Sequence, residues 1–124
     1  YLDFPATINR YGNAGVGFMV IPAWDFEVDD WLHCRMAVLR GVENGFAEVR
    51  AARQGRLTIS DAYGRIIKET STAQGEEASL VGDVPVDHVQ TIYAKYGDWF
   101  GIVDCIAAAC FIIALFVRKR NASA

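Results

Sequence analysis

The side chains able to do chemistry are few in this sequence and lie apart from one another. Cys34 is the only thiol outside the long apolar stretch near the C-terminus, and His33 stands directly before it. A thiol beside a base is the pairing that nucleophilic catalysis uses. Neighbouring residues of a helix point about 100° apart, however, so His33 and Cys34 make a poor nucleophile–base pair. We therefore expect Cys34 to be a small, half-buried thiol.

Sequence signatures of known catalytic and metal centres are also missing. The chain contains no G-x-S-x-G, H-E-x-x-H, P-loop or paired-glycine dinucleotide loop. Cys105 and Cys110 form no C-x-x-C motif, and no His/Cys cluster has the spacing of metal ligands. The residues alone therefore predict no catalytic residue, no metal and no cofactor in residues 1–98.

Two other positions are candidates for binding or support. Trp24 and Phe26 follow an apolar run, and the loop after a buried strand is where α/β folds hold their chemistry. These aromatic residues can form pocket walls or can cover the core, and the sequence favours neither. Glu43 lies on or beside the apolar stripe of a helix. It is either a buried carboxylate bonded to backbone amides or a residue at the border of the stripe.

The elements around these positions follow from hydrophobic periodicity and turn residues. We expect a helix opened by Pro5 and ended near Gly12, a buried strand over 16–21, a helix from about 29 to 44, strands over 46–52, 57–61 and 66–69, and a last broken strand over 78–86. The apolar stripe of the long helix consists of Leu32, Met36, Leu39 and Glu43, widened by Ala37 and Val38. This order predicts a layered α/β sandwich with a mixed sheet.

Residues 99–117 form the longest apolar stretch and contain a single charge, Asp104. As a helix they would extend about 28 Å, close to the ~30 Å hydrocarbon core of a bilayer. The carboxylate costs about 2.5–3.5 kcal/mol at mid-bilayer, and the ten Ile, Val, Leu and Phe residues outweigh it at about 0.3–0.6 kcal/mol each. We therefore expect a transmembrane helix rather than the core helix of a soluble domain.

The charges after this stretch predict its orientation. Arg118, Lys119 and Arg120 follow at once, and basic residues flank membrane helices on the cytoplasmic side. The tail over 118–124 is therefore expected in the cytoplasm and residues 1–98 on the periplasmic side of a bacterial inner membrane. The net charge is −3 with no basic patch before the tail, so nucleic acid is not an expected partner.

Five motifs in sequence order resemble one family. The motifs are Asp3-Phe4-Pro5, similar to the end of C-x-D-x-x-F-P; PAWDF over 22–26, similar to N-D-A-W-F; HCRMAVLRGVEN over 33–44, similar to H-x-x-M-A-x-x-R-A-x-E; QG with SDAYGR over 54–65, similar to N-x-G…D-x-x-G-R; and the segment over 84–99, similar to V-P…T-x-Y-x-R-x-G-D-W. The first is typical of nitrilase-type carbon–nitrogen hydrolases. The whole series, ending at a membrane span, resembles the apolipoprotein N-acyltransferases of that superfamily.

The resemblance implies an α/β fold and a division of the chain. Residues 1–98 would be the C-terminal part of a nitrilase-type αββα sandwich with a mixed sheet, and 99–117 one C-terminal transmembrane helix. It also implies an enzyme with a Glu-Lys-Cys triad, whose Cys takes an acyl chain from a phospholipid as a thioester and passes it to the N-terminal amine of a lipoprotein Cys. All three triad positions would precede Tyr1. The chain is therefore expected to be a piece of a longer protein, inactive alone.

Three residues match positions of interest in that family. Trp24 matches the loop Trp that lines the acyl and lipoprotein pocket, Glu43 the helix Glu that supports the fold near the site, and Tyr1 a position just past the nucleophile. The implied partners are a phospholipid donor, a lipoprotein acceptor and the membrane. Two alternatives stay open: a membrane-tethered amidase acting on a small amide, and a non-catalytic membrane-anchored interaction domain in which the Trp24 loop binds a partner.

Overall fold

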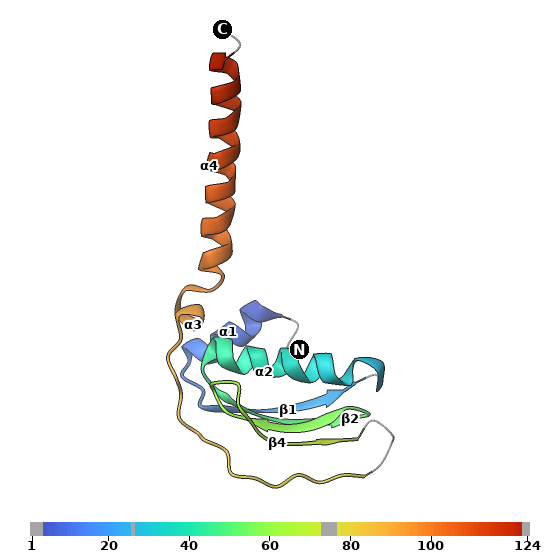
Figure 1. Cartoon of the computed structure of the whole chain (residues 1–124). Helices are drawn as coiled ribbons and strands as arrows, with labels where there is room; N and C mark the ends of the chain where they lie inside the picture. The colour runs from blue at the N-terminus through green and yellow to red at the C-terminus, as the bar shows by residue number, and fades with distance from the viewer. Residues whose placement is uncertain (1–3, 26, 73–76, 123–124) are drawn as a thin grey trace.

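The computed structural model describes residues 4–25, 27–72 and 77–122, and it confirms the α/β class and the order of the main elements (Figure 1). In chain order they are α1 (Pro5–Asn13), β1 (Phe18–Trp24), the short 3-10 helix η1 (Glu27–Asp29), α2 (Asp30–Asn44), β2 (Ala47–Arg53), β3 (Arg56–Ser60), β4 (Ile66–Ser71), α3 (Ile92–Tyr96) and α4 (Trp99–Ala122).

The four strands form one mixed sheet in the order β1-β2-β3-β4. β1 and β2 are parallel, and the other neighbours are antiparallel. Figure 1 shows α1 and α2 on the side of the sheet turned toward α4, with the segment over 77–86 on the opposite side before the chain passes the sheet to reach α3. On that side, the Lys68 ammonium donates a hydrogen bond to the Val81 carbonyl at 2.6 Å. The sheet is thus covered by helices on one face and by an extended segment over part of the other.

β1 departs from the predicted buried strand over 16–21. It begins at Phe18, ends at Trp24 and lies at the edge of the described sheet. Phe18 and Val20 are 44% and 62% exposed, so this strand is not covered on both faces. Pro22 lies inside the strand rather than closing it, because an edge strand tolerates the missing N–H.

α2 buries Ala37 and Val38 of the predicted apolar stripe and turns its larger members away from the sheet. Its buried residues are small: Cys34, Ala37, Val38, Gly41 and Asn44. Leu32 and Leu39 are each 51% exposed, so the larger side chains face outward. Small residues let the helix approach the strands closely, and this packing decides which side of the helix is buried.

The ends of α1 and α2 follow the expected turn chemistry in part. Gly45, with φ +75°, ends α2 as predicted. Asp29 stands at the N-cap position of α2, yet its side chain makes no capping hydrogen bond. α1 ends at Asn13, next to the predicted end at Gly12, and Gly12 packs so closely on Asn44 that a Cβ would lie 2.9 Å from its side chain.

A tight hairpin joins β3 to β4, which correspond to the strands predicted over 57–61 and 66–69. The Asp61 carboxylate accepts hydrogen bonds from the backbone N–H of Tyr63 and of Arg65, both at 2.9 Å, and Gly64 has φ +79°. The predicted strand over 78–86 is wrong, since this segment joins no strand ladder. Its bond from Lys68 comes from a side chain rather than from a strand backbone.

α4 is the one described helix that is long and apolar enough to cross a membrane. The candidate span is Trp99–Lys119, and none of it is buried against the rest of the chain. α3 leads into it, with the Thr91 hydroxyl accepting a hydrogen bond from the Ala94 N–H at 3.0 Å. Gly97, with φ +61°, joins the two helices.

Candidate functional site

The exposed aromatic candidate lies where the two parallel strands end. Trp24 is the last residue of β1 and pairs in register with Arg53, the last residue of β2. Parallel strands bring their carboxyl ends to one edge of a sheet, which is where α/β folds bind ligands. The residues that follow, Asp25 and Gln54, therefore lie at the same edge.

Trp24 is held in place although its ring is largely exposed. The ring is 64% exposed, and the Arg53 guanidinium lies 4.9 Å from its centroid. The indole Nε1–H donates a hydrogen bond to Gln54 Oε1 at 3.0 Å. Gln54 has φ +52°, a left-handed conformation that a non-glycine residue rarely adopts and that often marks functional sites. The ring is thus a fixed wall rather than a free surface side chain.

A buried ion pair lies beneath this edge. Arg50 Nη2 donates to Asp25 Oδ1 at 2.6 Å, and both side chains are nearly inaccessible to solvent. Gly55 passes so close that a Cβ there would lie 2.2 Å from Asp25 Oδ2. His33 Nδ1 lies 3.8 Å from Asp25 Oδ1, so this imidazole is turned toward the carboxylate. The pair anchors the strand ends that carry Trp24 and Gln54.

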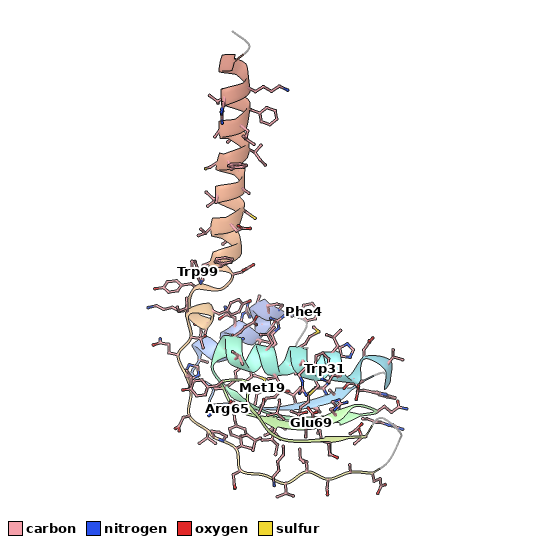
Figure 2. All side chains as sticks on the ribbon, in the orientation of Figure 1. Phe4, Met19, Trp31, Arg65, Glu69 and Trp99 are labelled. Carbon is pink, nitrogen blue, oxygen red and sulfur yellow. The ribbon has the colours of Figure 1, made fainter. Side chains whose placement is uncertain are left out.

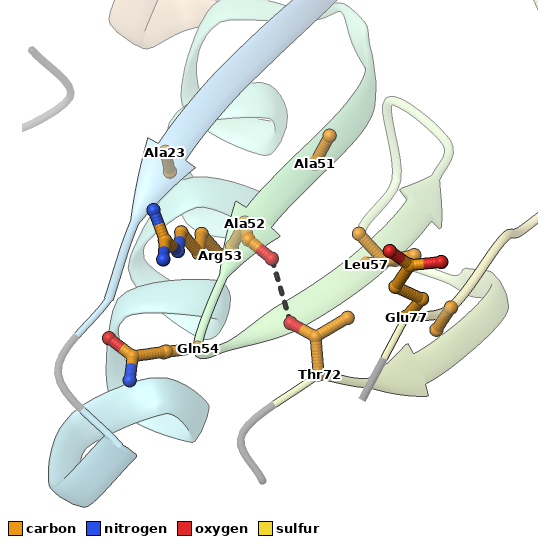
Figure 3. Close-up of a pocket in the computed structure, with 9 residues that line it drawn as sticks. Ala23, Ala51, Ala52, Arg53, Gln54, Leu57, Thr72 and Glu77 are labelled. Atoms are coloured by element: carbon orange, nitrogen blue, oxygen red, sulfur yellow. Dashed lines mark hydrogen bonds between the residues drawn. The ribbon is translucent and has the colours of Figure 1, made fainter. Parts of the chain in front are cut away.

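A cavity of about 730 Å³ opens at the same edge (Figure 3). It is lined by Ala23, Ala51, Ala52, Arg53, Gln54, Leu57, Thr72, Glu77 and Ala78. Thr72 closes one side, since its hydroxyl donates to the Ala52 carbonyl at 2.8 Å (Figure 3). Small apolar walls between one cation and one anion can hold an amphipathic ligand. Among the described lining residues there is no thiol or hydroxyl paired with a base.

Cys34 is more deeply buried than the half-buried thiol that the sequence predicted. It is fully buried, and its Sγ lies 2.9 Å from Thr58 Oγ1. Burial raises the pKa of the thiol, which keeps it protonated. Next to it, Arg35 Nη1 pairs with Glu69 Oε2 at 2.7 Å. Cys34 is therefore a structural thiol.

The structure does not bring Glu43 to the Trp24 edge. Glu43 lies just before the start of β2, whereas Trp24 pairs with the end of that strand. Its carboxylate is half-buried and pairs with Arg40, and its backbone carbonyl accepts a hydrogen bond from the Thr91 hydroxyl. The third predicted site residue, Tyr1, lies outside the described residues, as does Phe26.

A buried carboxyl group on β2 was missed by the sequence reasoning. Glu48 is fully buried on the helix-covered face of the sheet, opposite Ser60 in register. Among the described residues neither of its oxygens has a hydrogen-bond partner, and neither does Ser60 Oγ. Burial raises the pKa of Glu48 to about 8, although nearby Arg50 opposes the rise. The signal was the alternation of Glu48 and Arg50 with Val49, which is also the pattern of a solvent-facing strand.

Within the described ranges, no three His, Cys, Asp or Glu side chains are grouped so that they could hold a metal ion. The candidate site consists of the fixed ring of Trp24, the cavity beside it and the buried ion pair beneath them. Such an arrangement can bind and orient a ligand. It carries no nucleophile–base pair of its own among the residues described.

Comparison with known proteins finds relatives along nearly the whole chain. An apolipoprotein N-acyltransferase of Geobacter metallireducens is 33% identical over 95% of this chain and 23% of its own length. Apolipoprotein N-acyltransferase 2 of Treponema denticola is 29% identical over 96% of the chain and 23% of its own length. Apolipoprotein N-acyltransferase 1 of Treponema pallidum is 38% identical over 69% and 16%. The chain thus spans less than a quarter of these curated relatives. No family model matches it, and no solved structure matches it.

Proposed function

Because the chain is related to a segment of the apolipoprotein N-acyltransferases, we propose that it is the C-terminal part of such an enzyme. The complete polypeptide would transfer an acyl chain from a phospholipid to the N-terminal amine of a lipoprotein Cys. The observation that carries this proposal is the relatedness over 95% of the chain, ending in a helix able to cross a membrane. An acyl donor that is itself a membrane lipid requires an enzyme held at the bilayer.

The chemistry of this proposal divides between this chain and the polypeptide before it. An upstream Cys thiolate would attack the acyl ester, release the lysophospholipid and keep the acyl group as a thioester. The amine of the lipoprotein would then attack the thioester carbonyl and regenerate the thiol. Cys34 is not that nucleophile, because it is buried with a raised pKa. Residues 1–98 would support the site rather than perform the reaction.

The proposed role of Trp24 is to line the place where the acyl chain or the lipoprotein lies. Its fixed ring and the cavity that opens beside Arg53 and Gln54 support this role. The proposed role of Glu43 is to hold the fold. Its pair with Arg40 lies within α2, and the hydrogen bond from the Thr91 hydroxyl to its backbone carbonyl ties α2 to the start of α3.

The open face of the sheet supports the proposed domain boundaries. Phe18, Val20 and Trp24 are exposed on the face opposite the helices, which is a surface that an isolated layer leaves in contact with water. An αββα sandwich buries this face against a second sheet. We propose that the rest of the polypeptide supplies that sheet, that 1–98 belong to the hydrolase-type domain and that 99–117 span the membrane.

The positive-inside rule supports the proposed orientation, because Arg118 and Lys119 follow the apolar stretch. The tail would then lie in the cytoplasm and the α/β domain in the periplasm of a bacterial inner membrane. A protease added outside spheroplasts should cut within residues 1–98 and spare the C-terminus.

The test of the function is intact mass spectrometry of the complete polypeptide after incubation with phospholipid vesicles. The expected result is a mass gain of one acyl chain that hydroxylamine removes, because hydroxylamine cleaves thioesters. A folded protein that carries the upstream Cys and gains no acyl group would overturn the proposal. Hydrolysis of a small amide by that protein would instead identify a membrane-tethered amidase.

A further inference from the structure

α2 has two apolar sides, and only one is used inside the described structure. Cys34, Ala37 and Gly41 are buried against the sheet. We define the outer stripe as Trp31, Leu32, Met36 and Leu39. Leu32, Met36 and Leu39 recur at the spacing of one helix face, opposite the buried side, and Trp31 flanks them at the start of the helix. Trp31 is 55% exposed, both leucines are half exposed and Met36 is half-buried, so most of this apolar stripe is left uncovered in the described chain.

The neighbouring helix extends this surface. Phe4 and Tyr11 are exposed at α1, and their separation of seven residues places them on one side of that helix. Figure 2 shows Phe4 and Trp31 in the helical layer that lies between the sheet and α4. The two helices together therefore present aromatic and aliphatic side chains on the outside of this layer.

The candidate membrane helix is attached to the same layer. α3 packs on both α1 and α2, and Asn9 Nδ2 donates a hydrogen bond to the Tyr93 carbonyl at 3.4 Å. The chain then passes through Gly97 to Trp99, where α4 begins. Figure 1 shows α4 rising from the helical side of the sheet, with α2 running across the direction of α4. A bilayer crossed by α4 lies on the side to which the outer stripe is turned.

The charges near the stripe do not oppose contact with lipid. Arg35 reaches Glu69 on β4, and Arg40 pairs with Glu43, so both cations of α2 are engaged. The aromatic residues Tyr96 and Trp99 lie just before and at the start of the candidate span, as is typical of the membrane–water interface. An apolar helix face that lies parallel to the membrane binds at the headgroup–acyl boundary.

We propose that the outer stripe, with Phe4 and Tyr11, rests on the lipid surface from which α4 emerges. The helical layer is then a second membrane contact that fixes the height and tilt of the α/β domain above the bilayer. This inference rests on the proposal that α4 spans the membrane. Lipid is the proposed occupant of the outer stripe. Coverage of the stripe by a second copy of the chain or by another part of the polypeptide would contradict the proposal.

The test uses the complete polypeptide in vesicles of phosphatidylethanolamine and phosphatidylglycerol, with the photoreactive residue p-benzoylphenylalanine in place of Leu39. After irradiation, intact mass spectrometry should find a gain of one phospholipid. The matched control replaces Val81, an exposed apolar residue of the extended segment on the opposite side of the sheet, and should gain no lipid. A second control replaces Phe111 in α4 and should gain lipid.

The outcomes separate this inference from the proposal beneath it. Lipid on Phe111 but not on Leu39 would overturn the surface contact and leave the span intact. A dimer cross-linked at Leu39, or an internal cross-link to upstream residues, would overturn it as well and would identify the true occupant. Failure to label Phe111 would count against the span itself.

Discussion

The two faces of the sheet carry opposite kinds of side chain. The face under α2 contains Glu48, Arg50 and Thr58, all buried, whereas the opposite face of β1 exposes Phe18 and Val20. A helix–sheet layer usually buries its apolar side and leaves the polar one in water. Here the polar face is held by ion pairs and the apolar face is left open. We infer that much of the exposed apolar surface of this chain packs against groups outside the described residues.

The largest effect should come from breaking the polar face at its ion pair. Arg50→Met leaves the Asp25 carboxylate buried without its partner, which costs about 3–5 kcal/mol of unfolding free energy. Chemical denaturation of the complete polypeptide in detergent measures this loss. Arg65→Met is the matched control, because its pair with Asp61 involves a largely exposed guanidinium and should cost less than about 1 kcal/mol. Equal losses in both variants would contradict a special role for the buried pair.

A pH titration should sharpen the same comparison through Glu48. The pKa of Glu48 is raised by burial to about 8 from an ordinary 4.5, so the folded state keeps a proton that the unfolded state releases. This contribution to stability is complete below pH 4.5 and is lost as the pH rises toward 8. Since one pKa unit is worth about 1.4 kcal/mol, Glu48→Gln should gain a few kcal/mol over the wild type at pH 8. Glu77→Gln, at an exposed position, should follow the wild-type curve, and an unchanged curve for Glu48→Gln would refute the buried acid.

The open face can be probed at Val20. If a second sheet covers this face in the complete polypeptide, Val20→Asp buries an unpaired carboxylate and should cost about 2 kcal/mol or more. Val86→Asp is the control, because Val86 has the same exposed fraction of 62% but lies on the extended segment. Thermal unfolding in detergent distinguishes the two. A Val20 variant as stable as the Val86 variant would mean that this face stays in water.

The smallest expected effect concerns function rather than stability. Trp24→Ala removes the fixed aromatic ring that contacts the cavity residues Arg53 and Gln54. It should lower kcat/KM for acyl transfer about tenfold, or ~1.4 kcal/mol, with the unfolding transition unchanged. Tyr63→Ala removes a similarly exposed aromatic ring from the β3–β4 hairpin and should leave the rate as it was. A loss of stability in the Trp24 variant would mean that the ring stabilises the fold rather than the bound substrate.

Local rules predicted the elements well where the chain itself decides them. Gly45 and Gly64 adopt the positive φ values that their turns require, and the hairpin around Asp61 follows from its sequence. These features depend on backbone sterics within a few residues. The order of the elements and the mixed sheet could therefore be predicted before the structure.

Contacts between elements could not be predicted in the same way. Periodicity identified the stripe of Leu32 and Leu39, but the smaller side of α2 packs on the sheet. The alternation along β2 places Glu48 and Val49 on opposite faces, yet the pattern alone does not say which face is covered. The Trp24–Gln54 bond joins residues thirty positions apart and depends on the parallel pairing of β1 and β2.

Gly97 is the pivot between the α/β domain and α4, because it joins α3 to α4. α4 contains 24 residues and is therefore about 36 Å long, so a 10° change in direction at its start moves its far end by about 6 Å. If α4 spans a bilayer as proposed, a change in its tilt would reach the α/β domain through this junction. Any side chain other than glycine would stiffen the pivot and penalise its left-handed backbone, with φ +61°. Gly97 would thus couple the orientation of α4 to that of the α/β domain, beside the proposed contact of the helical layer with lipid.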